Sequence, residues 1–130
     1  MPDNALLKKL YFYKATSALI VNAPEVYWLL VGDIPHDTKA AAKKKGSYDF
    51  VQVFATTQKE LEKLIAAVVH DGKHDCLFWA CYPKGTGKIK SDIKRETVWV
   101  AFEAAGLEAV SSISIDETWT ALRARPLGVK

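Results

Sequence analysis

Cysteine is scarce in this sequence, which holds only Cys76 and Cys81 among 130 residues. Five positions separate them, and the alternating side chains of a strand would place two such residues on opposite faces. They form neither a CxxC pair nor a cluster with histidine, so the pattern excludes a disulfide framework and a cysteine-based metal site. We expect two reduced thiols in the core of a cytoplasmic protein.

Long hydrophobic runs are absent as well. No stretch approaches the roughly 18 apolar residues of a membrane-spanning helix. Residues 1–14 lack the uninterrupted apolar run and the cleavage site of a signal peptide. The sequence also lacks a Ser/His/Asp pattern, and Asp116 and Glu117 are adjacent rather than a spaced acid/base pair. We therefore expect no membrane association, no metal and no cofactor, and nothing in these residues indicates an enzyme.

The composition is that of an ordinary globular protein, with 49% hydrophobic and 25% charged residues. Its length predicts a single domain over residues 1–130. The net charge is +3, a smaller basic excess than nucleic-acid-binding proteins usually show, so composition does not indicate a nucleic-acid partner. Positive charge is instead concentrated in residues 83–95, where four lysines and one arginine accompany a single acidic residue, Asp92.

Helical and strand periodicities alternate along the chain. Apolar spacing predicts helices over residues 5–11, 24–31, 57–70 and 92–105, and strands over 17–22, 48–55, 76–82, 108–115 and 119–125. A capping box of Asn22 and Glu25 would open the second helix, and one of Thr57 and Glu60 the third. Residues 33–47 are predicted to form a loop, with one helical stretch over the alanines and lysines.

Strands that alternate with helices pair in parallel through right-handed crossovers. The last two strands are too close for a crossover and must form an antiparallel hairpin around residues 116–118. We therefore predict an α/β, Rossmann-like three-layer sandwich whose mostly parallel five-stranded sheet ends in an antiparallel hairpin. The strand at 17–22 would lie at a sheet edge, where it either pairs with a second copy, giving a homo-oligomer, or is covered by residues 5–14.

Four sequence motifs occur along nearly the whole chain: N-A-P-E at 22–25, Y-D-F-V at 48–51, W-x-x-Y-P-K at 79–84 and D-E-T-W-T-A-L-R at 116–123. On these motifs the chain resembles an uncharacterised family of small bacterial proteins of unknown function. The order of its elements also resembles the second half of the Rossmann-like fold of S-adenosylmethionine-dependent methyltransferases. That resemblance implies the fold, with the strand at 17–22 beside the strand at 48–55.

The sequence departs from methyltransferases after the first strand. Those enzymes bind the cofactor with a glycine-rich turn at this point and with an acidic residue that ends the second strand. Here Asn22, Ala23 and Pro24 replace the glycines, and residues 33–47 supply no clear second strand. Close approach of a nucleotide needs backbone glycines, and Pro24 also lacks an N–H donor. The binding surface for methyl transfer is therefore missing from the sequence.

Ligands of open α/β sheets bind outside the carboxyl ends of the strands, which here directs attention to residues 83–92. Two glycines, three lysines and a following helix N-terminus would suit a phosphate or carboxylate. The alternative is a solvated loop in which Ser91 or Asp92 merely caps the helix. Asn22 and Glu25 could likewise face a pocket or serve only as a cap.

Trp79 is expected in the core, whereas Trp119 follows a turn and is the best candidate for a partly exposed stacking surface. Arg123 and Arg125 share a strand face and either bind an anion or pair with neighbouring acids. The predicted ligand-binding residues are thus Asn22, Glu25, Lys84, Lys88, Lys90, Ser91, Asp92 and Trp119.

These observations favour a non-catalytic cytoplasmic module that binds a protein partner or a small anionic ligand. Two alternatives stay open. One is a divergent methyltransferase-like enzyme. The other is a weak RNA-binding protein that uses the lysines of residues 39–45 together with the loop at 84–90.

Overall fold

Five strands form one sheet in the order β1-β2-β3-β5-β4. The computed structural model describes residues 5–12, 16–32, 34, 36–38, 46–84 and 89–127. The strands are β1 (Ala18–Val21), β2 (Tyr48–Phe54), β3 (Gly72–Pro83), β4 (Leu107–Ser114) and β5 (Trp119–Pro126). The helices are α1 (Ala5–Lys9), α2 (Glu25–Val31), α3 (Gln58–Val68) and α4 (Arg95–Ala104).

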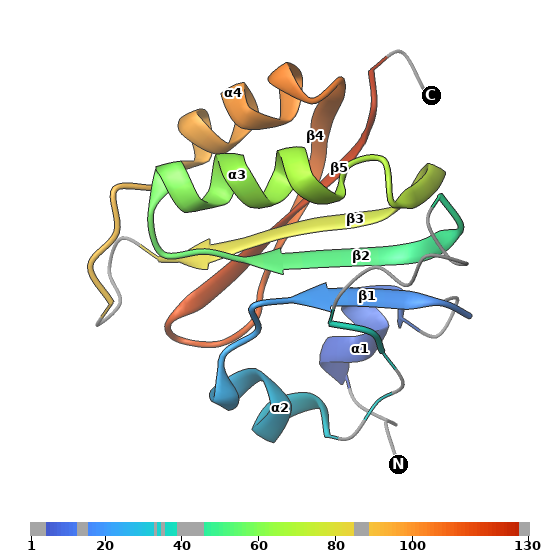
Figure 1. Ribbon diagram of the computed structural model, residues 1–130. Helices are drawn as coiled ribbons and strands as arrows, with labels where there is room; N and C mark the ends of the chain where they lie inside the picture. The colour runs from blue at the N-terminus through green and yellow to red at the C-terminus, as the bar shows by residue number, and fades with distance from the viewer. Residues whose placement is uncertain are drawn as a thin grey trace.

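The predicted fold class is confirmed. β1, β2 and β3 are parallel neighbours, while β5 lies antiparallel to both β3 and β4. Helices α3 and α4 cover one face of the sheet, and α1 and α2 lie on the other (Figure 1). The parallel part of the sheet, with β1 beside β2, and the closing hairpin are therefore arranged as the sequence predicts.

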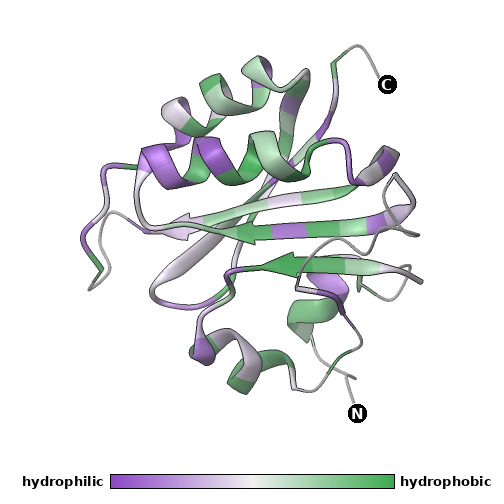
Figure 2. Ribbon diagram, viewed as in Figure 1, coloured by the Kyte–Doolittle hydropathy of each residue, from purple (hydrophilic) through white to green (hydrophobic). Residues whose placement is uncertain are grey.

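Two hydrophobic clusters lie on the two faces of the sheet. Phe78, Ala80 and Tyr82 of β3 join the cluster beneath α3 and α4, whereas Trp79 and Cys81 join the cluster beside α1 and α2. Because the second part of β3 is covered on both faces, residues 76–83 are all apolar or aromatic. Figure 2 shows apolar residues along β1 and β2, while α3 alternates between hydrophilic and hydrophobic residues along its length.

The edge of β1 is not covered as the sequence analysis expected. Asp37 forms a parallel bridge with Leu19, since the Ile20 amide donates to the Asp37 carbonyl and the Asp37 amide donates to the Ala18 carbonyl, both at 2.9 Å. Leu7 of α1 and Leu10, which follows the helix, pack instead in the cluster on the face of β1. The segment 33–47, predicted as a loop, thus contributes a one-residue neighbour to the sheet edge.

Candidate functional site at the carboxyl ends of the strands

The carboxyl ends of β1, β2 and β3 meet at one edge of the sheet (Figure 1). The chain leaves β1 toward the face that carries α2 and leaves β2 toward the opposite face, which carries α3. The gap between the ends of β1 and β2 is therefore the topological switch point, where ligands of open α/β sheets usually bind.

Asn22 spans this switch point. Its side-chain Nδ2 donates to the Phe54 carbonyl at 2.9 Å, so the amide takes the place of the next backbone donor in the β1–β2 ladder. The backbone of Asn22 is left-handed, with φ of 65°, a conformation that asparagine tolerates better than most residues. The side chain thus joins the two strand ends across the crevice.

The predicted capping role of Asn22 is wrong. Helix α2 begins at Glu25 with Pro24 in the cap position and no side-chain cap hydrogen bond. Glu25 is exposed in the first helical turn, where its negative charge suits the helix dipole. Asn22 is drawn away because its amide satisfies a carbonyl on β2, which the sequence pattern alone cannot show.

The N-terminus of α3 is occupied by side chains of the chain itself. The Thr56 amide donates to Glu60 Oε1 at 3.0 Å, and the Glu60 amide donates to Thr57 Oγ1 at 3.2 Å, which confirms Thr57 as the cap. The Gln58 amide donates to Asp92 Oδ1 at 2.7 Å. Two carboxylates therefore take donors that an external anion would otherwise use.

Asp92 consequently does not cap the helix that follows it, as one alternative proposed. It caps α3 from a distance in sequence, while Ser91 accepts a hydrogen bond from the Ile93 amide at 3.0 Å. At the start of α4, Thr97 Oγ1 accepts from the Lys94 amide at 2.9 Å. In the folded chain Asp92 lies next to the start of α3, and for that reason it caps α3 and not α4.

The predicted cationic group is only partly described. Lys84 directly follows β3, its amide donates to the Thr118 carbonyl at 2.7 Å, and its Nζ donates to Ser114 Oγ at 2.6 Å. Lys90 is exposed, and Lys88 lies outside the described residues, as do the lysines of residues 39–45 that the RNA-binding alternative invokes. The structure thus directs Lys84 toward β4 and the β4–β5 hairpin.

Trp119 is not the exposed aromatic residue that the sequence analysis expected. Only 4% of it is accessible, and its ring meets the edge of Phe54 with centroids 5.5 Å apart. Asp116 fixes the turn before it by accepting from the amides of Thr118 and Trp119 at 2.8 and 2.7 Å. The exposed tryptophan is Trp99 on α4, at 49%, while Trp79 is buried as predicted.

The arginines of β5 lie in different settings. Arg123 is half-buried, and its guanidinium lies over the Tyr11 ring, 5.3 Å from the centroid, a cation–π geometry. Arg125 stands opposite Glu108 in the β4–β5 register. A role for Arg123 in packing against the segment after α1 therefore explains its position without a ligand.

A second polar cluster lies on the α3/α4 side of the same sheet edge, and sequence reasoning missed it. Tyr82 pairs with Thr120 in the register between β3 and β5, and Thr120 pairs with Ser114 on β4. We call these three residues the hydroxyl row. Ser112 lies two residues before Ser114 and on the same face of β4. Arg95 Nη2 donates a hydrogen bond to Ser112 Oγ at 3.4 Å.

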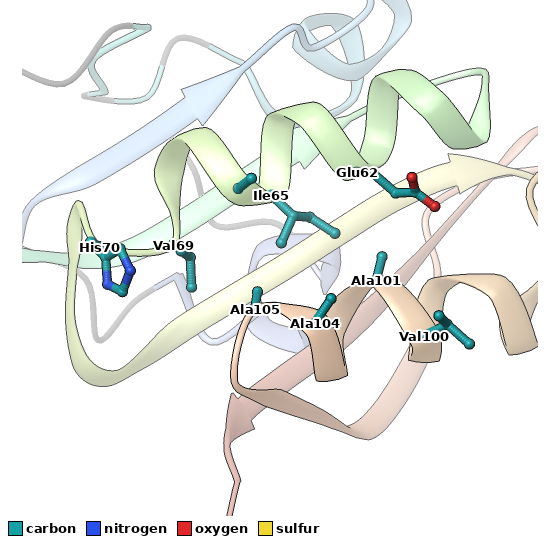
Figure 3. A pocket seen from close by; sticks show the side chains of 9 residues that line it. Glu62, Ile65, Val69, His70, Val100, Ala101, Ala104 and Ala105 are labelled. Carbon is teal, nitrogen blue, oxygen red and sulfur yellow. The ribbon is translucent and has the colours of Figure 1, made fainter.

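Two cavities differ sharply in character. The larger, about 520 Å³, lies between α3 and α4 and is lined mainly by apolar and small side chains, with Glu62 and His70 as its polar members (Figure 3). A smaller hollow of about 210 Å³ lies between α4 and β4, where Arg95, Trp99 and Ser112 line it. Of these two, only the smaller hollow is lined by members of the cluster, Arg95 and Ser112.

Within the described residues, no group of three His, Cys, Asp or Glu side chains is placed to hold a metal ion. Among the same residues, none of the helices is both long and apolar enough to cross a membrane.

No family model and no curated protein matches the chain. Solved structures do. One is a SAM-dependent methyltransferase from Aquifex aeolicus, with a TM-score of 0.56 and 14% identity over 92% of this chain and 88% of the other. The chain has a methyltransferase-like Rossmann fold.

A second similar structure is described as a type 11 methyltransferase from Sulfolobus solfataricus. Its TM-score is 0.57 and its identity 13%, over 98% of this chain and 80% of the other. Both likenesses cover most of each chain and thus extend beyond the second half on which the sequence resemblance was drawn. Identities this low show a shared methyltransferase-like fold and not a shared activity.

Proposed function

We propose that the chain is a cytoplasmic, methyltransferase-like binding module that does not transfer methyl groups. The observation that carries this proposal is the hydrogen bond from Asn22 Nδ2 to the Phe54 carbonyl. A nucleoside cofactor of this fold class lies in the switch-point crevice and needs close approach to small residues. Here an amide bridges the crevice, followed by the Ala23 methyl group and the Pro24 ring.

The hydrogen-bonding groups at the start of α3 support the same proposal. Glu60 and Asp92 hold the amides of Thr56 and Gln58. Their negative charge at this helix terminus stabilises α3 and repels anionic ligands. A cofactor at the end of β2 would have to displace these carboxylates.

The ligand of this module is proposed to be anionic, since residues 84–95 concentrate lysine and arginine at the carboxyl end of β3. Asp92, the single acidic residue of this segment, has its carboxylate held at the start of α3. Lys84 and Lys90 are the described members of the predicted set.

Titration with S-adenosylmethionine and with its demethylated product tests the proposal. We expect no heat of binding and no change in melting temperature at millimolar cofactor, with the Asn22→Gly variant measured in parallel as a more open crevice. A rise of several degrees for the wild-type protein would show binding to the folded state. That result would overturn the proposal in favour of a divergent methyltransferase.

The methyltransferase-like alternative is supported by the fold itself, so a direct assay must accompany the titration. Incubation with cofactor that carries a labelled methyl group, followed by analysis of protein and small-molecule fractions, would detect transfer. We expect no labelled product.

A further inference from the structure

We propose that Lys84, Arg95, Ser112 and Ser114 form a binding site for a phosphate-type oxyanion on the α4 side of the sheet edge. This inference rests on the proposed function, because it names the site and chemical class of the anionic ligand. It places the ligand beside β4 rather than in the loop over residues 85–88.

The hydroxyl row gives this site a fixed floor. Tyr82, Thr120 and Ser114 lie on three adjacent strands at matching positions, and they share a face because partners in register point the same way. Tyr82 belongs to the cluster beneath α3 and α4, which identifies that face. Ser112 and Ser114 extend the floor along β4, two residues apart and both exposed.

Two cations flank the exposed end of this floor. Lys84 Nζ donates to Ser114 Oγ at 2.6 Å, and Arg95 Nη2 donates to Ser112 Oγ at 3.4 Å. Both cations thus bond to neutral hydroxyl groups, which carry no negative charge of their own. Burial raises the pKa of Tyr82, and the nearby Arg95 guanidinium acts against that rise. The hydroxyl of Tyr82 thus stays protonated beside the arginine.

Glu96 is the carboxylate that also influences Tyr82. It follows Arg95 on α4, and both residues are exposed, so solvent screens both charges. Lys84 adds a second cation to the site, while the Asp116 carboxylate in the β4–β5 turn is held by the amides of Thr118 and Trp119.

The hollow between α4 and β4 has room for such a group. Its volume is about 210 Å³, and Arg95 and Ser112 line it together with Trp99. Arg95 and Trp99 are four residues apart and therefore lie on one face of α4. The guanidinium, the ammonium and the Ser112 hydroxyl suit a tetrahedral oxyanion, while the half-exposed indole offers a surface for an aromatic ring. The Ser114 hydroxyl donates to the Asp116 carbonyl at 3.2 Å and serves to hold Lys84 Nζ.

The same oxyanion chemistry has two sources, free phosphate and the phosphate group of an aromatic ester. Titration of the protein with inorganic phosphate and with phenyl phosphate, followed by calorimetry and by ³¹P NMR, separates them. If the ring of an ester stacks on Trp99, phenyl phosphate binds more tightly, and Trp99→Ala removes only that difference. Equal binding of the two probes, unaffected by Trp99→Ala, assigns free phosphate as the ligand and equally supports the oxyanion site.

Charge-removing variants test the site itself. We expect Lys84→Met and Arg95→Gln each to weaken phosphate binding about tenfold, because each removes a charge-assisted hydrogen bond. Lys63→Met is the matched control, since it removes the same charge from an exposed lysine of α3 that lies outside the basic segment. Its affinity should stay within about twofold of the wild type. Ser112→Ala with Ser114→Ala provides a variant that keeps every charge and should also weaken binding.

Two results would overturn the inference: no saturable binding of either probe, or a loss of affinity in Lys63→Met equal to that in Lys84→Met, which would indicate unspecific attraction. The cofactor titration remains separate from this test. If only phosphate binding fails, the oxyanion site is rejected, and the proposal of a non-catalytic module stands. Binding of S-adenosylmethionine contradicts the proposed function whether or not phosphate binds.

Discussion

At the scale of single residues, polar side chains replace backbone groups at the sheet edge. Asn22 does so with its amide, which satisfies the Phe54 carbonyl from a left-handed backbone. Both properties suit asparagine, which tolerates this conformation and carries two side-chain donors. The residue that closes the crevice therefore also terminates β1.

Substitution of Asn22 separates the contribution of its side-chain hydrogen bond from that of its left-handed backbone. Asn22→Gly keeps the backbone freedom and loses one hydrogen bond, which should cost about 1 kcal/mol of unfolding free energy. Asn22→Ala loses the bond and adds left-handed strain, so it should cost roughly 1–2 kcal/mol more. Urea denaturation of the wild type and the two variants measures their order of stability. Equal stability of the glycine and alanine variants would contradict the left-handed assignment.

At the scale of elements, β1 is a strand of only four residues that is held along both edges and at its start. β2 pairs with one edge and Asp37 with the other. At the start, the Asp49 carboxylate accepts from the amides of Thr16 and Ser17 and from Thr16 Oγ1, at 2.7 to 3.1 Å. This clamp fixes the entry of β1 beside β2.

The Asp49 clamp makes stability depend on pH. Partial burial acts to raise the pKa of Asp49, but the hydrogen bonds from Thr16 and Ser17 and the nearby Lys73 outweigh it and lower the pKa below 3.8. The stabilisation is therefore present above about pH 4 and is lost as the pH falls through the folded-state pKa. Asp49→Asn should cost about 1 kcal/mol at pH 7, because the site is mostly exposed.

Chemical denaturation of the wild type and of Asp49→Asn between pH 7 and pH 2 tests this dependence. The difference in unfolding free energy should narrow on the acidic side. A difference that stays constant would show that the charge of Asp49 does not contribute.

At the scale of the whole molecule, the sheet separates two cores, and β3 contributes to both. Cys76 packs at the border of the core beneath α3 and α4, whereas Cys81 is fully buried on the other face. Cys81 accepts a hydrogen bond from Gln52 Nε2 at 3.3 Å, and Gln52 Oε1 accepts one from Tyr27. The cluster beside α1 and α2 covers Cys81, so its thiol is reached only when that core opens.

Thiol labelling should report this difference. Burial raises the pKa of Cys81 to about 12, against which the hydrogen bond from Gln52 acts, so the group is not ionised at pH 8. We expect an aromatic disulfide reagent to modify Cys76 in the native protein and Cys81 only at the rate of global unfolding. The Cys76→Ala variant isolates the second reaction. Rapid labelling of Cys81 in that variant under native conditions would contradict the two-core arrangement.

The sequence predicts what depends on short-range pattern. The apolar run of β3, the stripe of α3 and the closing hairpin all stand as expected, because burial imposes a period on each of them. The capping roles predicted for Asn22 and Asp92 and the exposure predicted for Trp119 are wrong. Each depends on a partner distant in sequence: the Phe54 carbonyl, the start of α3 and the Phe54 ring.

The basic segment of residues 84–95 was recognisable from the sequence, but its partners were not. Ser112 and Ser114 share a face by their spacing, and so do Tyr82 and Lys84. Only the strand order β3-β5-β4 brings the two pairs to the same side of one sheet edge. A sequence of five strands permits several orders, so no local signal could identify this cluster.

The sequence by itself determined the alternation of helices and strands, the two-sided burial of β3 and the absence of a glycine turn after β1, since local sterics and burial set all three. The tertiary structure decided which carbonyl Asn22 satisfies, which helix Asp92 caps, and which hydroxyl groups face Lys84 and Arg95. Hydrogen bonds between distant segments form only after the sheet has brought them together, and for that reason their partners are not written in any short stretch of the chain.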